Sequence, residues 1–272
     1  MKFVDKAFAR RLESGEEIPQ VFYARAFQKT RPNVGAEEEA ICGGHMSFCG
    51  LGSPVGRAVG LGLDRPFTEA DLDHVEAFYR SHRAPAQVDL CPMHEPAVFE
   101  VFKHRGYAIA ELNNVLYRKL DANETFPAPP AGCEIRRARL EEAGTTGAIV
   151  ESAFFPDGAP EAFGGLITPF YQMEGAVAFV ASVDGKLVAC GTGLIIPEHT
   201  MFALCGAGTL ADYRGRGLQT ALLRARIAAA AKAGCEYAVV VTQGGTTSQR
   251  NAERLGFRVA YSKVTVIKHV ST

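Results

Sequence analysis

The sequence predicts a mixed α/β fold arranged as two tandem domains. Strand and helix patterns alternate along both halves of the chain, and a Pro-rich stretch, DANETFPAPPAG at 121–132, separates them. Each half also closes with the same order of helix, Gly-aromatic pair and strand. We therefore expect one domain at 1–120, a linker at 121–132 and a second domain at 133–272, each long enough to bury its own core.

The composition is typical of a globular, cytoplasmic protein. Of the 272 residues 47% are hydrophobic and 22% are charged, and no apolar run reaches the roughly 20 residues that span a bilayer. Lys plus Arg (29) nearly balances Asp plus Glu (30), so the net charge of −1 gives no global attraction to nucleic acid or to a membrane. Seven scattered cysteines and a charged start without an apolar leader favour free thiols in a reducing compartment.

The N-terminal half reads as four helices and four strands. Its helices are expected at 3–14, 17–29, 69–82 and 95–103, and its strands at 40–48, 55–63, 87–90 and 107–118. Thr68 is the expected N-cap of the third helix. This order resembles the C-terminal half without its first strand, which suggests a degenerate duplication.

The C-terminal half predicts antiparallel strands followed by a parallel crossover. A strand at 134–138 and a helix at 140–155 come first, and then Asp184-Gly185 lies between two β-branched runs, the pattern of a tight hairpin. A strand at 200–210, a helix at 218–233 and a buried strand at 237–242 follow. Antiparallel pairs joined to a βαβ crossover require a mixed sheet.

The turn ADYRGRG at 211–217 carries the strongest chemical signal. A Gly-punctuated turn between strand and helix aims unpaired backbone N–H groups into one concavity, where the helix dipole favours an anion such as a phosphate. The alternative is a plain turn whose glycines serve only its backbone angles. Residues 206–211 also fit G-x-G-x-x-A, but a second Gly turn follows where a dinucleotide-binding helix would already have begun.

The strand, the Arg214-Gly215-Arg216-Gly217 turn and the next helix resemble the R/Q-x-x-G-x-G/A signature of the GNAT acyltransferase superfamily. Gln219 stands where that signature usually has Gly or Ala. The resemblance continues through YAVVVT and SQRNAERLGF and covers roughly 133–269. It implies acetyl-CoA, or another acyl-CoA, as co-substrate and, commonly, a primary amine as acceptor.

The resemblance also assigns residues to the coenzyme. Backbone amides of the turn would hold the CoA diphosphate, and the 205–210 strand would hydrogen-bond the pantetheine arm. The implied binding residues are Gly208, Thr209, Leu210, Arg214, Gly215, Arg216, Gly217, Leu218, Gln219, Thr220, Ser248 and Asn251. Ser248 and Asn251 are equally consistent with a helix N-cap and an exposed helix residue.

The proton-transfer residues of the family are missing from this sequence. Ala252 stands at the position of the usual acid, a Tyr, and an apolar residue near Ala203 stands where some members carry a Glu base. His199, Tyr171 and Glu174 are the remaining catalytic candidates, although solvated or core roles fit each of them. Proton transfer through water is the other expectation.

The function predicted for the second domain is transfer of an acetyl group from acetyl-CoA to a small primary amine or amino-acid-like acceptor by direct attack. A catalytically silent acyl-CoA sensor is the alternative, and an aminoacyl transferase using charged tRNA is the least favoured, because such members tend to lose the phosphate turn.

In the first domain Asp64 and Glu69 lie where that turn would fall, so we expect no CoA binding there. No nucleic-acid or membrane partner is expected, a homodimer is left open, and 159–174 is expected to help wall the acceptor pocket.

Metal binding is not expected from the spacing of cysteines and histidines. Cys91 to His94 (CPMH) and His45 to Cys49 are the two closest approaches to a ligand pattern, and neither has a second matching pair.

Overall fold

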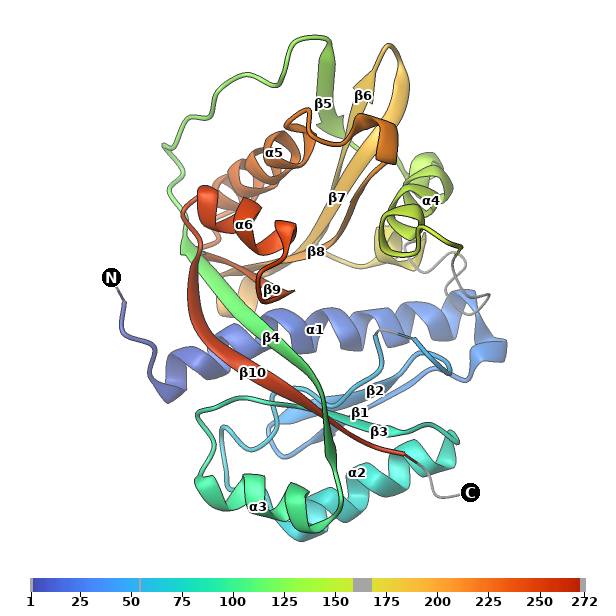
Figure 1. The fold of residues 1–272 in the computed structure, drawn as a ribbon, viewed down its shortest axis with the longest axis vertical. Helices are drawn as coiled ribbons and strands as arrows, with labels where there is room; N and C mark the ends of the chain where they lie inside the picture. Colours follow the sequence, from blue (N-terminus) through green and yellow to red (C-terminus); the bar gives the residue numbers. More distant parts are fainter. Residues whose placement is uncertain (1, 54, 159–167, 270–272) are drawn as a thin grey trace. The chain divides into compact units, whose positions relative to one another are not determined.

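A computed structural model describes residues 2–53, 55–158 and 168–269 (Figure 1). The chain forms two compact units. The first unit contains Met1–Leu116, Val241–Thr246 and Val259–Thr272, and the second contains Tyr117–Val240 and Thr247–Arg258. The units do not follow a single cut at the linker, because β10 (Arg258–Lys268) pairs antiparallel with β3 (Ala86–Leu90) and so places the last strand in the first unit.

The first unit packs three helices against its strands, of which β1, β2 and β3 are short. Its remaining elements are α1 (Lys6–Thr30), β1 (Glu37–Ile41), β2 (Gly44–Phe48), α2 (Glu69–Ser81), α3 (Pro96–His104) and most of β4 (Ala108–Lys119). Thr68 caps α2 as predicted, accepting a hydrogen bond from the Asp71 N–H. Leu72, Val75 and Val88, none of them exposed, lie at the centre of its core.

The expectation of two helices at 3–14 and 17–29 is wrong. α1 is one helix of 25 residues. Ser14 and Glu17, which read locally as a break, are buried (1% and 4% exposed), and Glu17 accepts from His45 Nδ1 at 2.7 Å and pairs with Arg10 at 2.6 Å. Tertiary contacts of this kind override the weak local preference for a turn.

Two of the expected strands also differ. The 40–48 segment is the β1–β2 hairpin, because Cys42 (φ 48°) and Gly43 (φ 80°) both adopt the left-handed conformation that a two-residue turn requires. The 55–63 segment forms only isolated bridges, Val59 with His45 and Ala58 with Val88.

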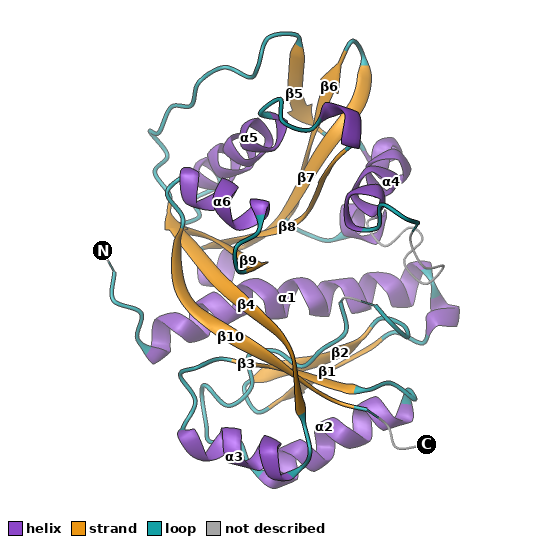
Figure 2. Cartoon of the chain, in the orientation of Figure 1, coloured by secondary structure: helices purple, strands orange, loops and turns teal. Residues whose placement is uncertain are grey.

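The second unit contains the mixed sheet that the sequence predicts (Figure 2). Its elements are β5 (Cys133–Arg137), α4 (Ala143–Phe154), β6 (Ala176–Val183), β7 (Lys186–Ile196), β8 (Met201–Thr209), α5 (Leu218–Lys232), the first part of β9 (Tyr237–Gln243) and α6 (Thr247–Arg254). The strand order is β9-β8-β7-β6-β5, antiparallel from β5 to β8 and parallel between β8 and β9. The hairpin at Asp184 (φ 50°) and Gly185 (φ 77°) is confirmed.

Helices cover both faces of this sheet. A Cβ on Gly208 of β8 would meet the backbone of α4, whereas one on Gly191 of β7 would meet Arg226 of α5. Within the described ranges no helix is both long and apolar enough to cross a bilayer. All seven cysteines are free thiols.

Candidate functional site

The site begins where two parallel strands separate. β8 and β9 are in register only at Met201–Tyr237, Phe202–Ala238 and Ala203–Val239, although β8 continues to Thr209. Residues 204–207 are half-buried, in contrast to the fully buried start of the strand. The separation therefore leaves one backbone edge of β8 open to a ligand that binds as an added strand would.

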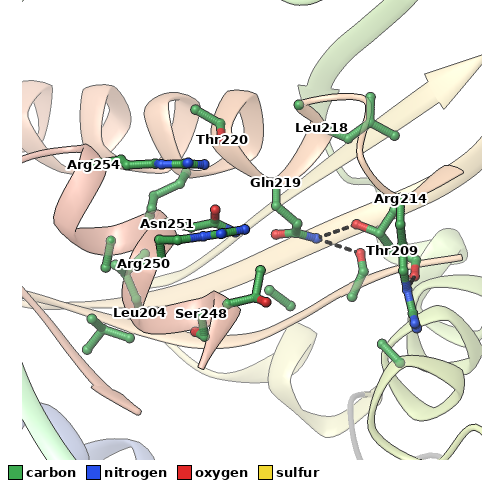
Figure 3. Close-up of a pocket in the computed structure, with 18 of the residues that line it drawn as sticks. Leu204, Thr209, Arg214, Leu218, Gln219, Thr220, Ser248, Arg250, Asn251 and Arg254 are labelled. Carbon is green, nitrogen blue, oxygen red and sulfur yellow. Dashed lines mark hydrogen bonds between the residues drawn. The ribbon is translucent and has the colours of Figure 1, made fainter. Parts of the chain in front are cut away.

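A cavity of about 720 Å³ occupies this part of the second unit (Figure 3). Its volume is within the usual range for small-molecule sites. Its walls come from α4, β8, the turn before α5, α5, the middle of β9 and α6. The residues that line it include Leu204, Cys205, Thr209, Arg214, Gly217, Gln219, Arg226, Val240, Arg250, Ala252 and Arg254.

The N-terminus of α5 opens into the cavity without a cap. Gly215 (φ 77°) and Gly217 (φ 75°) both take the left-handed conformation, and Gly217 offers no side chain to the helix. The first helical bond runs from the Ala221 N–H to the Gly217 carbonyl, so the N–H groups of residues 218–220 precede it and have no helical acceptor. Such a terminus is an anion site, with about half a positive charge from the helix dipole.

Gln219 fixes this terminus to the sheet. Its Nε2 donates to the Gly208 carbonyl (2.7 Å), Thr209 Oγ1 (2.9 Å) and the Cys190 carbonyl (3.2 Å). The three acceptors share the two protons of one amide group. Where the family signature usually has Gly or Ala, Gln219 therefore adds a side chain that connects α5 to β7 and β8. The backbone N–H of Gln219 stays at the open start of the helix.

The charged side chains that line the cavity are all arginines. These are Arg214, Arg226, Arg250 and Arg254, and no Asp or Glu lines it within the described chain. Arg214 donates from Nε to the Thr209 carbonyl at 3.2 Å. Arg250 and Arg254 lie one turn apart on α6 and extend toward α5 (Figure 3). The cavity is therefore suited to a polyanionic ligand.

Most of the predicted coenzyme residues line this cavity. The exceptions are Leu210 and Arg216. Leu210 packs into the apolar core and donates its N–H to the Val188 carbonyl at 2.9 Å. Arg216 is exposed, stacks on the Tyr213 ring and donates to the Asp212 carbonyl at 3.1 Å.

The catalytic candidates lie outside the cavity lining. His199 precedes β8, at the opposite end of that strand from the open turn before α5, and Glu174 is exposed. Tyr171 donates to Thr146 Oγ1 at 2.7 Å, and burial raises the pKa of its hydroxyl to about 12. Their roles stay predictions, and 159–167 of the expected acceptor wall lies outside the described residues. Ala252, at the family's acid position, lines the cavity and is buried.

Three lining arginines were not predicted from the sequence. Arg250 and Arg254 had a signal, because their i, i+4 spacing in SQRNAER puts both on one face of a helix. Arg226 had none. It lies in LLRARIAAAAKAG, where apolar residues surround the helix and no periodicity shows which face is buried.

Residues 148–257 match the model of the Acetyltransferase (GNAT) family, a range that includes the open turn, the separated strands and α6. This segment of the chain is a GNAT acetyltransferase domain. It is therefore an acyltransferase, and the predicted family, enzyme class and mixed α/β fold are confirmed. Among curated proteins no match was found.

Solved structures of the GNAT fold resemble the chain beyond the matched range. A GCN5-related N-acetyltransferase from Kribbella flavida is 22% identical, with 80% of this chain and 82% of that one covered and a TM-score of 0.60. One from Sphaerobacter thermophilus is 18% identical, with 78% and 69% covered and a TM-score of 0.58. A tandem GNAT protein from the clavulanic acid biosynthesis pathway is 13% identical, with 92% and 88% covered and a TM-score of 0.63. At these identities the likeness is one of fold.

Proposed function

We propose that the second unit transfers an acetyl group from acetyl-CoA to a small primary amine. The observation that carries this proposal is one continuous cavity, which starts at the uncapped N-terminus of α5 and follows the open edge of β8. The family supplies the acyl-transfer class. The acetyl donor and the amine acceptor are the proposed parts.

The residues present fit coenzyme A. The diphosphate would be held by the N–H groups at the start of α5, since the turn has no Cβ at Gly215 or Gly217 and none of the described acidic residues lines the cavity. The two pantetheine amides would hydrogen-bond the open edge of β8. Arg250 and Arg254 would meet the remaining phosphate of the coenzyme.

The chemistry that this site supports is direct attack by a neutral amine on the thioester. Backbone N–H groups of β8 that face away from β7 have lost the β9 partner beyond Ala203, and they would stabilise negative charge on the carbonyl oxygen. Ala203 and Ala252 carry no titratable group, so the amine proton would pass to water.

The phosphate site is tested by changing the charge at Gly217 while keeping the backbone shape. Asn and Asp both tolerate the left-handed conformation, and a Cβ there would meet only Pro130 Cγ at 3.5 Å. We expect Gly217→Asn to bind CoA within about threefold of wild type and Gly217→Asp to lose at least about tenfold by calorimetry, because a carboxylate at the terminus repels phosphate.

The matched control is Gly234→Asp, at the other end of the same helix. Gly234 is also left-handed (φ 85°) and has open space where a Cβ would stand. It should leave CoA affinity unchanged. Equal affinity of the Asn and Asp variants at position 217 would remove the phosphate site from this turn.

A catalytically silent acyl-CoA binder is the second candidate, and buried Ala252 is the observation that favours it. Thiol release from acetyl-CoA across a panel of amines and amino acids separates the two functions. Release that depends on one class of amine supports the transferase. Tight CoA binding with no release from any of them supports the sensor.

A further inference from the structure

Arg226 is a buried cation without a counter-charge. It is 4% exposed, it lines the cavity, and no carboxylate of the described chain lies within 4.0 Å of its guanidinium. Nε donates to the Leu222 carbonyl at 3.3 Å and Nη1 to the Thr192 carbonyl at 2.9 Å, whereas Nη2 has no hydrogen-bond partner among the described residues. A cation held in this way costs stability unless a ligand supplies negative charge.

The guanidinium lies at an irregularity in the sheet. Gly191 of β7 pairs with Ala207 of β8, and Gly193 pairs with Leu204. Between these two pairs β7 advances by two residues and β8 by three, so β8 contains one extra residue opposite Thr192. Thr192 is the residue whose carbonyl accepts from Arg226. A bulge releases backbone groups from the ladder, and bulges are frequent beside active sites.

Gly191 makes room for this arrangement. A Cβ at that position would lie 2.6 Å from Arg226 Cζ and 2.8 Å from Nη2. The guanidinium therefore lies directly against the β7 backbone, and any larger residue at position 191 would displace it.

Arg226 lies at the depth that the reacting end of the substrate requires. It follows Gly217 by nine helical residues, a rise of about 14 Å along α5. The pantetheine arm is a chain of about a dozen bonds between phosphate and sulfur, on the order of 14 Å when extended. Ala252 and Val240, which line the same cavity, add no charge there.

We propose that Arg226 is a catalytic residue whose guanidinium stabilises the negative charge that develops on the substrate sulfur. In the step the amine nitrogen bonds to the acyl carbon, the carbon–sulfur bond breaks, and its electron pair passes to sulfur. The amine proton passes to water, and the thiolate leaves beside the guanidinium. Arg226 thereby replaces the proton donor that the site lacks at Ala252. The inference rests on the proposed function.

The electrostatics favour the transition state over the bound substrate. An acetyl thioester is neutral and leaves the cation uncompensated, whereas the charge on sulfur appears only as the bond breaks. An interaction that strengthens in this way raises kcat without tightening substrate binding. Burial lowers the pKa of Arg226 to about 10, and the thiols of Cys190 and Cys205, the titratable groups that act on it, oppose this shift.

The test measures binding of the free thiol, apart from turnover. CoA and desulfo-CoA, which lacks the sulfur, are titrated calorimetrically into wild type and Arg226→Met between pH 7 and 9.5. Wild type should prefer CoA by a factor that grows with pH, to about tenfold, because a thiol pKa lowered by one unit corresponds to that factor. Arg226→Met should bind both compounds equally, and Arg226→Lys should keep part of the preference.

Two further measurements exclude a merely structural role. Removing an uncompensated buried cation should leave the melting temperature of free Arg226→Met at or above that of wild type. Gly191→Ala keeps the charge but displaces the guanidinium, and it should lower the thiol preference as well. In Arg226→Met, kcat should fall about 100-fold while KM for acetyl-CoA changes less than threefold.

The results that would contradict the role of Arg226 differ from those that would contradict the proposed function. If wild type binds CoA and desulfo-CoA equally at all pH values, Arg226 has no role at sulfur, although the CoA site stands. Wild type could instead prefer an acyl-CoA whose acyl group carries a carboxylate, with Arg226→Met preferring acetyl-CoA. In that case the cation pairs with the acyl carboxylate and the inference is wrong. If wild type binds neither compound, the inference and the proposed function fall together.

Discussion

At the residue scale, burial decides the protonation state of isolated polar side chains. His94 in the first unit is 7% exposed, and neither ring nitrogen has a hydrogen-bond partner among the described residues. Burial, and then the positive charge of Lys6, lowers the pKa of His94 to about 4. The ring is therefore neutral in the folded protein at physiological pH, whereas it binds a proton below about pH 6.5 once unfolded.

This difference predicts a pH-dependent loss of stability. Because the unfolded chain binds the extra proton, the stability present above about pH 6.5 declines as the pH falls toward 4. His94→Leu removes the titrating group. Between pH 7 and pH 4.5 wild type should lose about 2 kcal/mol more unfolding free energy than this variant.

Urea unfolding followed by far-UV circular dichroism measures the effect, since the chain has no Trp. His104→Gln, at an exposed position, serves as the control and should follow wild type. Parallel pH profiles for wild type and His94→Leu would show that the ring is not held neutral.

At the scale of elements, α6 presents two cations to the cavity from a short helix. Only Ala252 of its eight residues is buried, so the helix is held by one side and its arginines are free to bind. Neither Arg250 nor Arg254 makes an ion pair within the described chain. Exposed arginines without acidic partners can pair fully with a phosphate.

The matching prediction concerns the phosphate on the ribose of CoA. Arg250→Gln and Arg254→Gln should each reduce the preference for CoA over dephospho-CoA by about five- to tenfold, because one charge-assisted contact is lost. Calorimetric titration with both compounds measures the ratio. Arg216→Gln, outside the cavity, should leave it unchanged. A ratio unchanged in the α6 variants would place that phosphate elsewhere.

Elements with local chemical signals were predictable. The Asp184-Gly185 hairpin needs left-handed backbone at two adjacent positions, and Asp-Gly provides it. The open turn before α5 was predictable for the same reason, because Gly215 and Gly217 supply conformations that few other residues adopt. By contrast, nothing local indicates that α1 continues past Gly15, since the partners of Glu17 and Glu13 lie on β2 and β10.

At the scale of the whole molecule, contacts between chain ends build the first unit. Lys263 is 1% exposed and pairs with Asp89 at 3.2 Å, with Glu13 at 3.5 Å and with Glu16. Burial opposes the charge of Lys263, and these three carboxylates more than offset it, raising its pKa. Glu13 and Tyr261 are 248 residues apart in sequence and hydrogen-bond at 2.6 Å. Such a network has no periodicity or spacing, so the sequence could not indicate that the chain returns to the first unit.

The same limit applies to the candidate site. The open turn before α5 is one contiguous segment, and most of the residues predicted there line the cavity, whereas Leu210 and Arg216 do not. Their role in binding coenzyme stays a prediction. Arg226 reaches the cavity through the packing of α5 on a bulged sheet, which depends on contacts with Gly191 and Thr192. Its position follows from three elements together and not from any one of them.

A crystal structure of the protein with coenzyme A bound tests the account most directly. We predict diphosphate oxygens within about 3.2 Å of backbone N–H groups at the start of α5, and the sulfur beside Arg226 at the bulge of β8. A diphosphate bound anywhere other than the turn between Leu210 and Leu218 would contradict the account.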